Sequence, residues 1–502
     1  MSHHRLQILA ADVEHRFVSL ATLIIVWSIG SHSCFSSLFS SVGMGLDGYA
    51  TITPLSMPSP ASRRTIVARG FVAVVTTCAL SAQSGTRWTT PTSAEVDAVF
   101  PDVDALYVTL HRSPELGFQE VQTAATLAAR LKTLGFDVTT GVGKTGIVGI
   151  LKNGAGPTVM LRTELDALPV EEKTGLPFAS TVVTKNAAGQ STPVMHACGH
   201  DLHMAAWSGT ARLMAEHRDR WSGTLMMVGQ PAEEALGGAR AMLTDGLFTR
   251  FPKPDFALSL HDDDTMPAGT IGYHPGLFRA MSDTVTITVY GRGGHGAMPH
   301  NTIDPIVLAS RIVLSLQTIV SRENNPVDPI VITVGSIHGG TQANVIPDEV
   351  RLQLSVRTYT DEVRTRTFAA IRRVAKGEAT AAGAPKEPLV ETPERGNPPV
   401  FNDPMLTLRL AGALKKELGD AVVVEMPAKM TSEDFSEYGL AGVPSALLHV
   451  GAVHPTKLAA ARQSGVPVPA PHSPEWAPER EPTLKGAIRA ETTALLELFR
   501  GR

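Results

Sequence analysis

The feature that most constrains this chain is one short segment rich in metal-ligand side chains, His196-Ala197-Cys198-Gly199-His200-Asp201. Cys198 and His200 are two residues apart, so a loop or strand end can direct a thiolate and an imidazole toward one point. Further along the chain come the pair Glu233-Glu234, a lone His261 after an apolar run, and His472 near the C-terminus. This mixture suits zinc, manganese, cobalt or nickel. Because adjacent carboxylates allow one to bind metal while the other acts as a base, the pattern indicates a metal-dependent hydrolase.

The composition is typical of a globular protein large enough for two or three domains, each with its own core. Of 502 residues, 43% are hydrophobic and 18% are charged, and the net charge of -4 gives no electrostatic footprint for nucleic acid. Three cysteines occur, and Cys34 and Cys78 lie in the expected targeting region. A mature chain would keep Cys198 alone, which excludes an internal disulfide.

An export signal is expected at residues 57–82. Residues 57–69 (MPSPASRRTIVAR) are basic, residues 70–80 (GFVAVVTTCAL) are apolar, and small residues follow. This is the layout of a bacterial signal peptide, and residues 62–67 also resemble a twin-arginine signal. We therefore expect a periplasmic or secreted protein that begins near Gln83. The alternative is that the apolar run is a buried helix of the folded domain.

Residues 1–56 have no clear organisation. Residues 17–30 are apolar, but the region lacks helix caps and hydrophobic periodicity. Our hypothesis is that the protein starts at Met57 and that the preceding residues are an upstream extension. The alternative, which we do not expect, is a membrane anchor through residues 17–30, with a few flanking residues needed to reach spanning length.

The next part of the chain reads as alternating helices and strands. Residues 94–134 have apolar side chains at helical spacing, and short β-rich runs follow at 147–151 and 158–161. A helix is expected at 204–217, a buried strand at 223–228 before the glutamate pair, and a strand at 256–260 that ends at His261. Such alternation predicts an α/β sheet whose strand ends carry the candidate ligands.

From Asp283 the pattern changes to that of a compact α+β domain. The chain alternates as a half-buried strand at 285–290. The elements that follow are a helix at 305–320, strands near 330–337 and 349–359, and a helix at 361–382. This β-α-β-β-α run of about 110 residues predicts an inserted domain. Several prolines between Pro393 and Pro404 then return the chain to the first domain.

Ordered motifs along the chain carry a family resemblance. Residues 111–118 (HRSPELGF) match an H-x-x-P-E-L-G-F motif, and residues 162–169 (RTELDALP) match R-A-D-M-D-A-L-P with changes. The segments HACGHD, QPAEE, GGHGAMPH, NVIPD, SEDF and HSP follow in the same order. With these motifs the chain resembles the metallopeptidase family of hippurate hydrolase, N-acyl-amino-acid amidohydrolases, plant auxin-conjugate hydrolases and related carboxypeptidases. The resemblance extends from about Val96 to Phe499.

The resemblance implies an α/β fold: a zinc-peptidase-like catalytic domain with a mixed sheet flanked by helices, interrupted by an inserted α+β (ferredoxin-like) lid or dimerisation domain. It implies hydrolysis of the amide bond of N-acyl amino acids or small peptides, two divalent metal ions (Mn, Zn, Co or Ni) and a homodimer. The expected segments are an extension at 1–56, a signal peptide at 57–82, the catalytic domain at 94–281 and 396–502, and the lid at 282–395.

The resemblance also assigns roles to single residues. Glu233 would be the general base, and Asp166 would orient a metal ligand. Cys198 would bridge the two ions. The lid groups that contact a substrate carboxylate or oxyanion would be His295, Asn344 and Arg357, with His295 reaching the site of a dimer partner. The metal ligands would be Cys198, His200, Glu234, His261 and His472.

Three features depart from the family pattern or leave an assignment open. Glu164 stands where the family usually has Asp. The run Asp262-Asp263-Asp264 replaces aromatic or apolar residues, and we expect a solvated loop there rather than extra ligands. The connection 451–471 before His472 is long, so His449 and His454 stay open as competing ligands.

Two other functions stay open from the sequence. One is a hydrolase that uses Cys198 as its nucleophile, with His200 or His196 as the base. Residues two apart rarely meet in that geometry, and the glutamate pair would be unexplained. The other is a non-catalytic peptide-binding protein that keeps the fold, against which the retained Glu233 argues.

Overall fold

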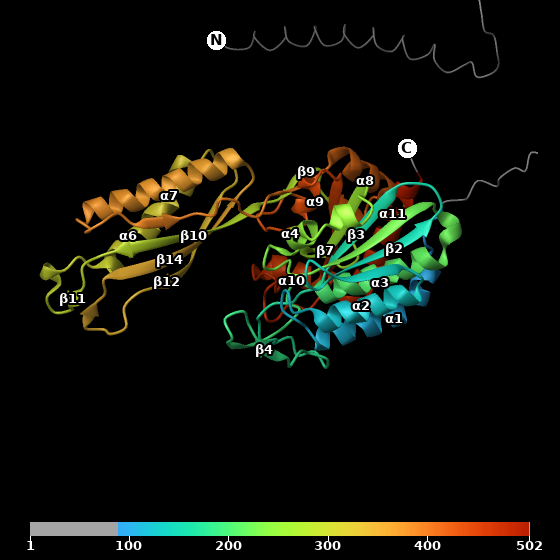
Figure 1. Ribbon diagram of the computed structural model, residues 1–502, viewed down its shortest axis with the longest axis horizontal. Helices are drawn as coiled ribbons and strands as arrows, with labels where there is room; N and C mark the ends of the chain where they lie inside the picture. Colours follow the sequence, from blue (N-terminus) through green and yellow to red (C-terminus); the bar gives the residue numbers. More distant parts are fainter. Residues whose placement is uncertain (1–88, 501–502) are drawn as a thin grey trace, which may run out of the picture. The chain divides into compact units, whose positions relative to one another are not determined.

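The computed structural model describes residues 89–500. The expected extension, the expected export signal and the cysteines Cys34 and Cys78 all lie outside the described residues. The elements that follow therefore belong to the remainder of the chain (Figure 1).

An eight-stranded mixed sheet forms the larger of the two main sheets, in the order β1-β2-β6-β3-β7-β18-β8-β17. Its four central strands, β6, β3, β7 and β18, are parallel to their neighbours within that group. Strands β1 and β2 add antiparallel pairs at one edge, and β8 pairs antiparallel with β18 near the other. The bounds are β1 Asp137–Val142, β2 Gly146–Asn153, β3 Thr158–Glu164, β6 Gly223–Gln230, β7 Phe256–Pro267, β8 Ile271–Tyr273, β17 Val423–Glu425 and β18 Ser445–Val453.

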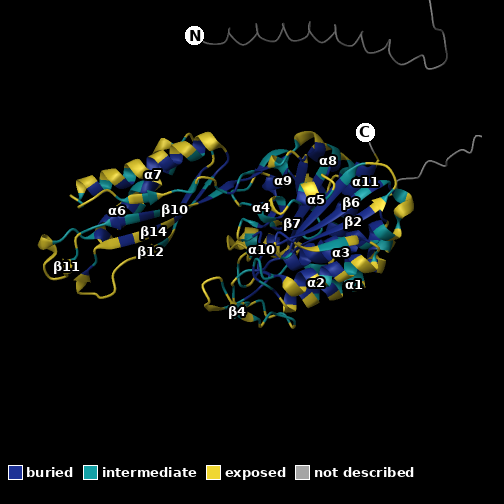
Figure 2. Ribbon diagram, in the orientation of Figure 1, coloured by how far each residue is buried: buried dark blue, intermediate teal, exposed yellow. Residues whose placement is uncertain are grey.

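Helices cover both faces of this sheet, which confirms the expected α/β architecture. Strand β6 shows how the faces divide: Leu225 and Met227 enter one core, while Met226 and Val228 enter the core on the opposite face. Figure 2 shows the central strands mostly buried. One face is covered by α1 Ser93–Arg112, α2 Val121–Thr133, α3 His200–Glu216, α8 Pro404–Leu418 and α11 Arg480–Phe499. The other is covered by α4 Gly238–Thr244, α5 Leu247–Arg250 and α9 Ser436–Leu440.

Two expected elements differ from the structure. The helical segment expected over 94–134 is two helices, α1 and α2, because Pro114 and Gly117 interrupt it. The strand expected to end at His261 continues to Pro267, because β18 pairs with β7 over that whole length.

The smaller main sheet has four antiparallel strands in the order β12-β14-β10-β15. Its burial alternates along β10 and β14, and two helices cover the buried face. With the chain order β-α-β-β-α-β this is the expected ferredoxin-like unit. Its elements are β10 Met281–Tyr290, α6 Pro305–Thr318, β12 Val331–His338, β14 Glu349–Thr358, α7 Asp361–Ala381 and β15 Leu389–Glu391.

Helix α6, with the π-turn Ile319–Glu323 that continues it, has the length and apolar composition of a membrane span. Its buried side chains, Leu308, Ile312 and Leu316, pack in the core of the four-stranded unit. Ile306, Val307 and Leu314 of the same helix are exposed. The segments that lead into and out of the unit pair with each other between Ser282 and Asn397.

The remaining elements are short. Among the described residues these are β4 Val183–Lys185, β5 Ser191–Pro193, β9 Gly276–Arg279, β11 Gly294–His295, β13 Val345–Ile346, β16 Val400–Asn402, α10 Pro455–Ser464 and the turns Arg218–Arg220 and Pro299–Asn301.

Candidate metal centre

The Asp166 carboxylate, just after β3, holds the two glutamates that follow β6. The backbone N–H of Glu233 donates to Asp166 Oδ1 at 3.1 Å, and that of Glu234 donates to Oδ2 at 3.0 Å. The backbone carbonyl of Asp166 lies 2.8 Å from His200 Nδ1. Ala232, with φ 48°, turns the chain into the position that both contacts require. One buried residue thus orients two carboxylates and an imidazole, which fits the orienting role expected for Asp166.

Cys198 is placed by the tight turn that begins α3. Gly199 has φ 77°, and a Cβ there would overlap the Asp262 carboxylate, so only glycine fits. The buried Cys198 Sγ lies 3.6 Å from His261 Nε2. His261 Nδ1 lies 2.8 Å from the backbone carbonyl of Asp262, which leaves Nε2 directed at the thiol.

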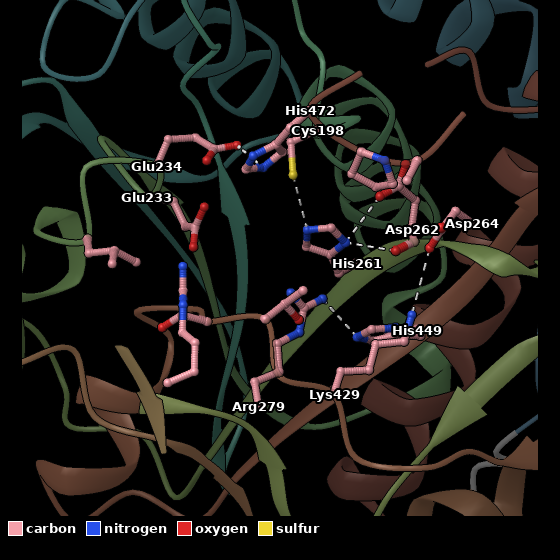
Figure 3. A pocket seen from close by; sticks show the side chains of 16 residues that line it. Cys198, Glu233, Glu234, His261, Asp262, Asp264, Arg279, Lys429, His449 and His472 are labelled. Carbon is pink, nitrogen blue, oxygen red and sulfur yellow. Dashed lines mark hydrogen bonds and ion pairs between the residues drawn. The ribbon is translucent and has the colours of Figure 1, made fainter. Parts of the chain in front are cut away.

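A cavity of about 420 Å³, shown in Figure 3, is lined by Cys198, Glu233, Glu234, His261 and His472. His472 Nε2 lies 3.3 Å from Glu234 Oε1, and the backbone N–H of His472 donates to the Ala197 carbonyl at 2.7 Å. His200 Nε2 lies 3.8 Å from Glu233 Oε2 and 4.0 Å from Glu234 Oε1. The structure therefore brings together all five expected ligands and the expected base.

The donor atoms fall into overlapping groups that fit two metal ions. Within each of the groups Cys198–His200–His261 and Cys198–Glu234–His472, the ligand atoms lie within 4.8 Å of one another. Cys198 belongs to both groups. His200 Nε2 is buried without a hydrogen-bond partner, although buried polar atoms are normally satisfied. Soft sulfur, imidazole and carboxylate donors suit zinc and its neighbours, so the residues fit the expected pair of cations.

The local electrostatics divide the two glutamates. Burial, followed by the nearby charges of Glu433 and Glu234, raises the pKa of Glu233 well above its usual value. Burial acts on Glu234 too, but the hydrogen bond from His472 and the charge of His200 outweigh it and lower the pKa of Glu234. Glu234 is thus suited to remain an ionised ligand, and Glu233 is suited to accept a proton.

Burial and the carboxylate of Glu234 raise the pKa of the Cys198 thiol well above its usual value. A nucleophilic cysteine needs the opposite environment. Bound cations would supply the charge that stabilises a thiolate here.

The aspartate run is not the solvated loop expected from the sequence. Asp262 and Asp263 are buried within β7, because their carboxylates are paired. Asp262 accepts a hydrogen bond from Trp476 Nε1 at 3.2 Å, and Asp263 Oδ2 lies 2.7 Å from His449 Nδ1. Asp262 and Asp264 both line the cavity, and of the three aspartates only Asp264 has part of its side chain exposed.

The competing histidines have other roles. His449 is paired with Asp263, while His454 caps α10 by accepting the backbone N–H of Thr456 at 3.2 Å. The connection before His472 is long because it contains α10. Glu164 is fully buried in an ion pair with Arg162 and lies 3.1 Å from His203 Nδ1, so it does not line the cavity.

The groups expected from the lid are separated in the structure. Arg357 lines the cavity, but His295 and Asn344 do not. The latter two are exposed beside each other, on β11 and just before β13. Within one chain, therefore, only Arg357 of this group is near the glutamate pair.

The structure also places cations at the cavity that the sequence did not reveal. Arg279, in β9, and Lys429 both line it. Neither belongs to a motif with ligand spacing, so no sequence signal distinguished them from ordinary basic residues.

Comparison with known proteins identifies the family. Residues 160–465 match the model of peptidase family M20/M25/M40. The chain belongs to this family. A solved structure titled as a dinuclear metal-binding peptidase of the M20 family, from Bacillus subtilis, is 28% identical and covers 80% of this chain and 99% of its own, with a TM-score of 0.64.

Two curated proteins similar to this chain are named for the hydrolysis of an N-acyl amino acid. N-acetyl-L-cysteine deacetylase of Bacillus subtilis (strain 168) is 36% identical over 68% of this chain and 78% of its own length. Hippurate hydrolase of Campylobacter jejuni subsp. jejuni serotype O:2 is 40% identical over 54% of this chain and 68% of its own length. This M20 protein is a metal-dependent hydrolase of amide or peptide bonds. The comparisons therefore favour a metal-dependent hydrolase over a hydrolase with a Cys198 nucleophile and over a non-catalytic peptide-binding protein.

If Cys198 is shared by two ions, Cys198→Ala removes a donor from both groups. We expect the purified variant to lose most bound metal and its activity, as measured by elemental analysis after dialysis. His454→Ala is the matched control, because His454 caps α10 away from the donors, and should keep its metal. A fully metallated Cys198→Ala protein would contradict the assignment, as would activity that survives chelation but is lost to a thiol reagent.

Proposed function

We propose that this protein hydrolyses the amide bond of N-acyl amino acids or small peptides, with Glu233 as general base. The observation that carries the proposal is the glutamate pair: Glu233 and Glu234 line one cavity, and the Asp166 carboxylate holds the backbone N–H groups of both. The metal ligands proposed are Cys198, His200, Glu234, His261 and His472.

Two divalent ions held by these donors would polarise the scissile carbonyl and lower the pKa of the attacking water. The chain's own contribution is positioning and proton transfer. Glu233 is 5% exposed and is fixed through its backbone N–H by Asp166. Its carboxylate would take a proton from the attacking water and deliver it to the departing amine nitrogen.

The substrate class rests on the cation that the lid brings to the cavity. Arg357 has a planar guanidinium that can hold a carboxylate by two hydrogen bonds, and it lies on β14 at the cavity wall. N-acyl amino acids and peptides carry such a carboxylate close to the amide. The names of the relatives, hippurate hydrolase and N-acetyl-L-cysteine deacetylase, agree with this substrate chemistry.

Glu233→Gln keeps the size of the side chain and its ability to form hydrogen bonds but removes the base. We expect kcat to fall by about 10²–10⁴ on a panel of N-acetyl amino acids, N-benzoyl amino acids and dipeptides, with metal content unchanged. Glu171→Gln, at an exposed glutamate, is the matched control and should keep wild-type turnover. A metallated Glu233→Gln enzyme with wild-type kcat would exclude the role.

We further propose a homodimer in which His295 acts at the partner's site. His295 and Asn344 are exposed and away from the cavity of their own chain, so a second copy is one way to bring them to a site. The four-stranded unit also has a surface that a second copy could cover. Its strand β12 is an edge strand, and Val307 and Leu314 of α6 are 57% and 71% exposed.

Subunit mixing tests the proposed exchange. Glu233→Gln and His295→Ala homodimers should each have low activity. A mixed dimer combines one intact Glu233 with one intact His295, so about half of its sites should be restored if His295 acts across the interface. Activity is measured after mixing under dissociating conditions, with mixed dimers verified by distinct affinity tags. No recovery in verified mixed dimers would place His295 within its own chain's site.

We also propose export through the segment at residues 57–82, which lies outside the described residues. The support is its basic, then apolar, then small-residue pattern. N-terminal sequencing of protein from the extracytoplasmic fraction should find a start near Gln83, and a cytoplasmic protein with an intact Met1 would end the proposal.

A further inference from the structure

Arg279 is a buried cation on the wall of the catalytic cavity. Its side chain lines the cavity, yet the residue is only 6% exposed. Its Nε is buried and has no hydrogen-bond partner. Buried charges in proteins are normally paired, because the desolvation of an isolated ion is costly. Arg279 therefore lacks the negatively charged partner that a buried guanidinium normally has.

The one hydrogen-bond partner of the Arg279 side chain among residues 89–500 does not supply that charge. Arg279 Nη2 donates to His449 Nε2 at 2.9 Å. His449 Nδ1 faces Asp263 Oδ2 at 2.7 Å, so its proton lies on Nδ1 and its lone pair on Nε2. The imidazole accepting the guanidinium hydrogen bond is thus neutral. Over the same residues, no carboxylate oxygen lies within 4.0 Å of the Arg279 guanidinium.

The nearby aspartates are paired with a different cation. Lys429 Nζ lies 2.5 Å from Asp263 Oδ2 and 3.9 Å from Asp264 Oδ1. In Figure 3, His449 and Asp264 lie on one side of His261, and Glu233 and Glu234 lie on the other. His449 and Asp263 thus act as positioning residues that fix the Arg279 guanidinium without cancelling its charge.

We propose that Arg279 binds a second carboxylate of the substrate, one in addition to the carboxylate proposed for Arg357. This inference rests on the proposed hydrolysis of N-acyl amino acids and narrows it to substrates with two anionic groups. The cavity of about 420 Å³ lies within the size range of pockets that hold small organic ligands. The second carboxylate has two possible sources, an acidic amino-acid side chain or a dicarboxylic acyl group.

Matched pairs of substrates test the inference, because each pair differs only in one charge. N-acetylglutamate is compared with N-acetylglutamine for the amino-acid end, and N-succinyl-leucine with its succinamyl analogue for the acyl end. In the wild-type enzyme the acid of at least one pair should have the higher kcat/KM. In Arg279→Met that acid-to-amide ratio should fall at least about 10-fold, since a buried cation that loses its partner anion loses a strong interaction.

Two further variants sharpen the result. Arg279→Lys keeps the positive charge, so it should retain part of the wild-type acid-to-amide ratio of kcat/KM. If the guanidinium had only a structural role, this ratio would not depend on the charge at residue 279. Arg366→Met removes a 46%-exposed guanidinium side chain on α7 and should leave the ratio unchanged. Equal ratios in wild type and Arg279→Met, or amides preferred over both acids in wild type, would overturn the inference.

A binding measurement separates this inference from the proposed function. Calorimetry compares glutarate with glutaramate on the metal-loaded wild-type protein, which requires no turnover. Glutarate should bind at least about 10-fold more tightly, and Arg279→Met should lose that difference. If no substrate is turned over but glutarate still binds more tightly than glutaramate, the proposed reaction is rejected and the anion site is kept. If the amide substrates are turned over but glutarate has no advantage over glutaramate, the anion site is rejected and the proposed reaction is kept.

Discussion

A fully buried arginine ties together the segments from which the catalytic cavity is built. Arg162, in the central strand β3, has no exposed side-chain surface. Its guanidinium pairs with Glu164, lies 2.8 Å from Glu433 Oε1 and lies 3.1 Å from Asp434 Oδ1. Removing one partner of a buried ion pair costs about 3–5 kcal/mol, because the remaining charge is left uncompensated. The motif residues Glu433 and Asp434 are thus held against the sheet by the Arg162 guanidinium, which cannot be solvated by water instead.

The same network fixes the loop that carries the glutamate pair. Asp434 Oδ1 accepts from Gln230 Nε2 at 2.7 Å, and its Oδ2 accepts from the backbone N–H of Ala239 at 3.0 Å. Both ends of the loop between β6 and α4 are therefore bound to one carboxylate. Asp166 holds the middle of that loop from the other side. The proposed base and its neighbouring ligand are positioned by residues that never enter the cavity, which is how a rigid centre is built on a loop.

The sequence predicted the parts of the site that are short-range or motif-bound. Cys198 and His200 are two residues apart, and the two glutamates are adjacent. The chain itself keeps each pair close together in any fold, so their proximity could be predicted. The burial of Asp262 and Asp263 could not be predicted, because it depends on Trp476 and His449, which are distant in the chain. An isolated aspartate run is more often solvated, and only the pairing of β7 with β18 reverses that expectation.

The positions of the lid residues also could not be predicted from the sequence. The family resemblance assigned His295, Asn344 and Arg357 to one functional set, but the fold separates Arg357 from the other two. Whether a second chain reunites them is a matter of quaternary structure, which no pattern in one chain encodes. Arg279 was missed because its importance comes from an absent counter-charge, and a sequence does not record what a side chain lacks.

The central claim is that one cysteine is shared by two metal sites in a single cavity. Anomalous X-ray diffraction from crystals of the manganese-loaded protein measures this directly, because each ion gives its own peak. The account predicts two peaks about 3.5–4 Å apart, both in contact with Cys198 Sγ. A single peak, or two peaks of which only one contacts Cys198, would contradict it.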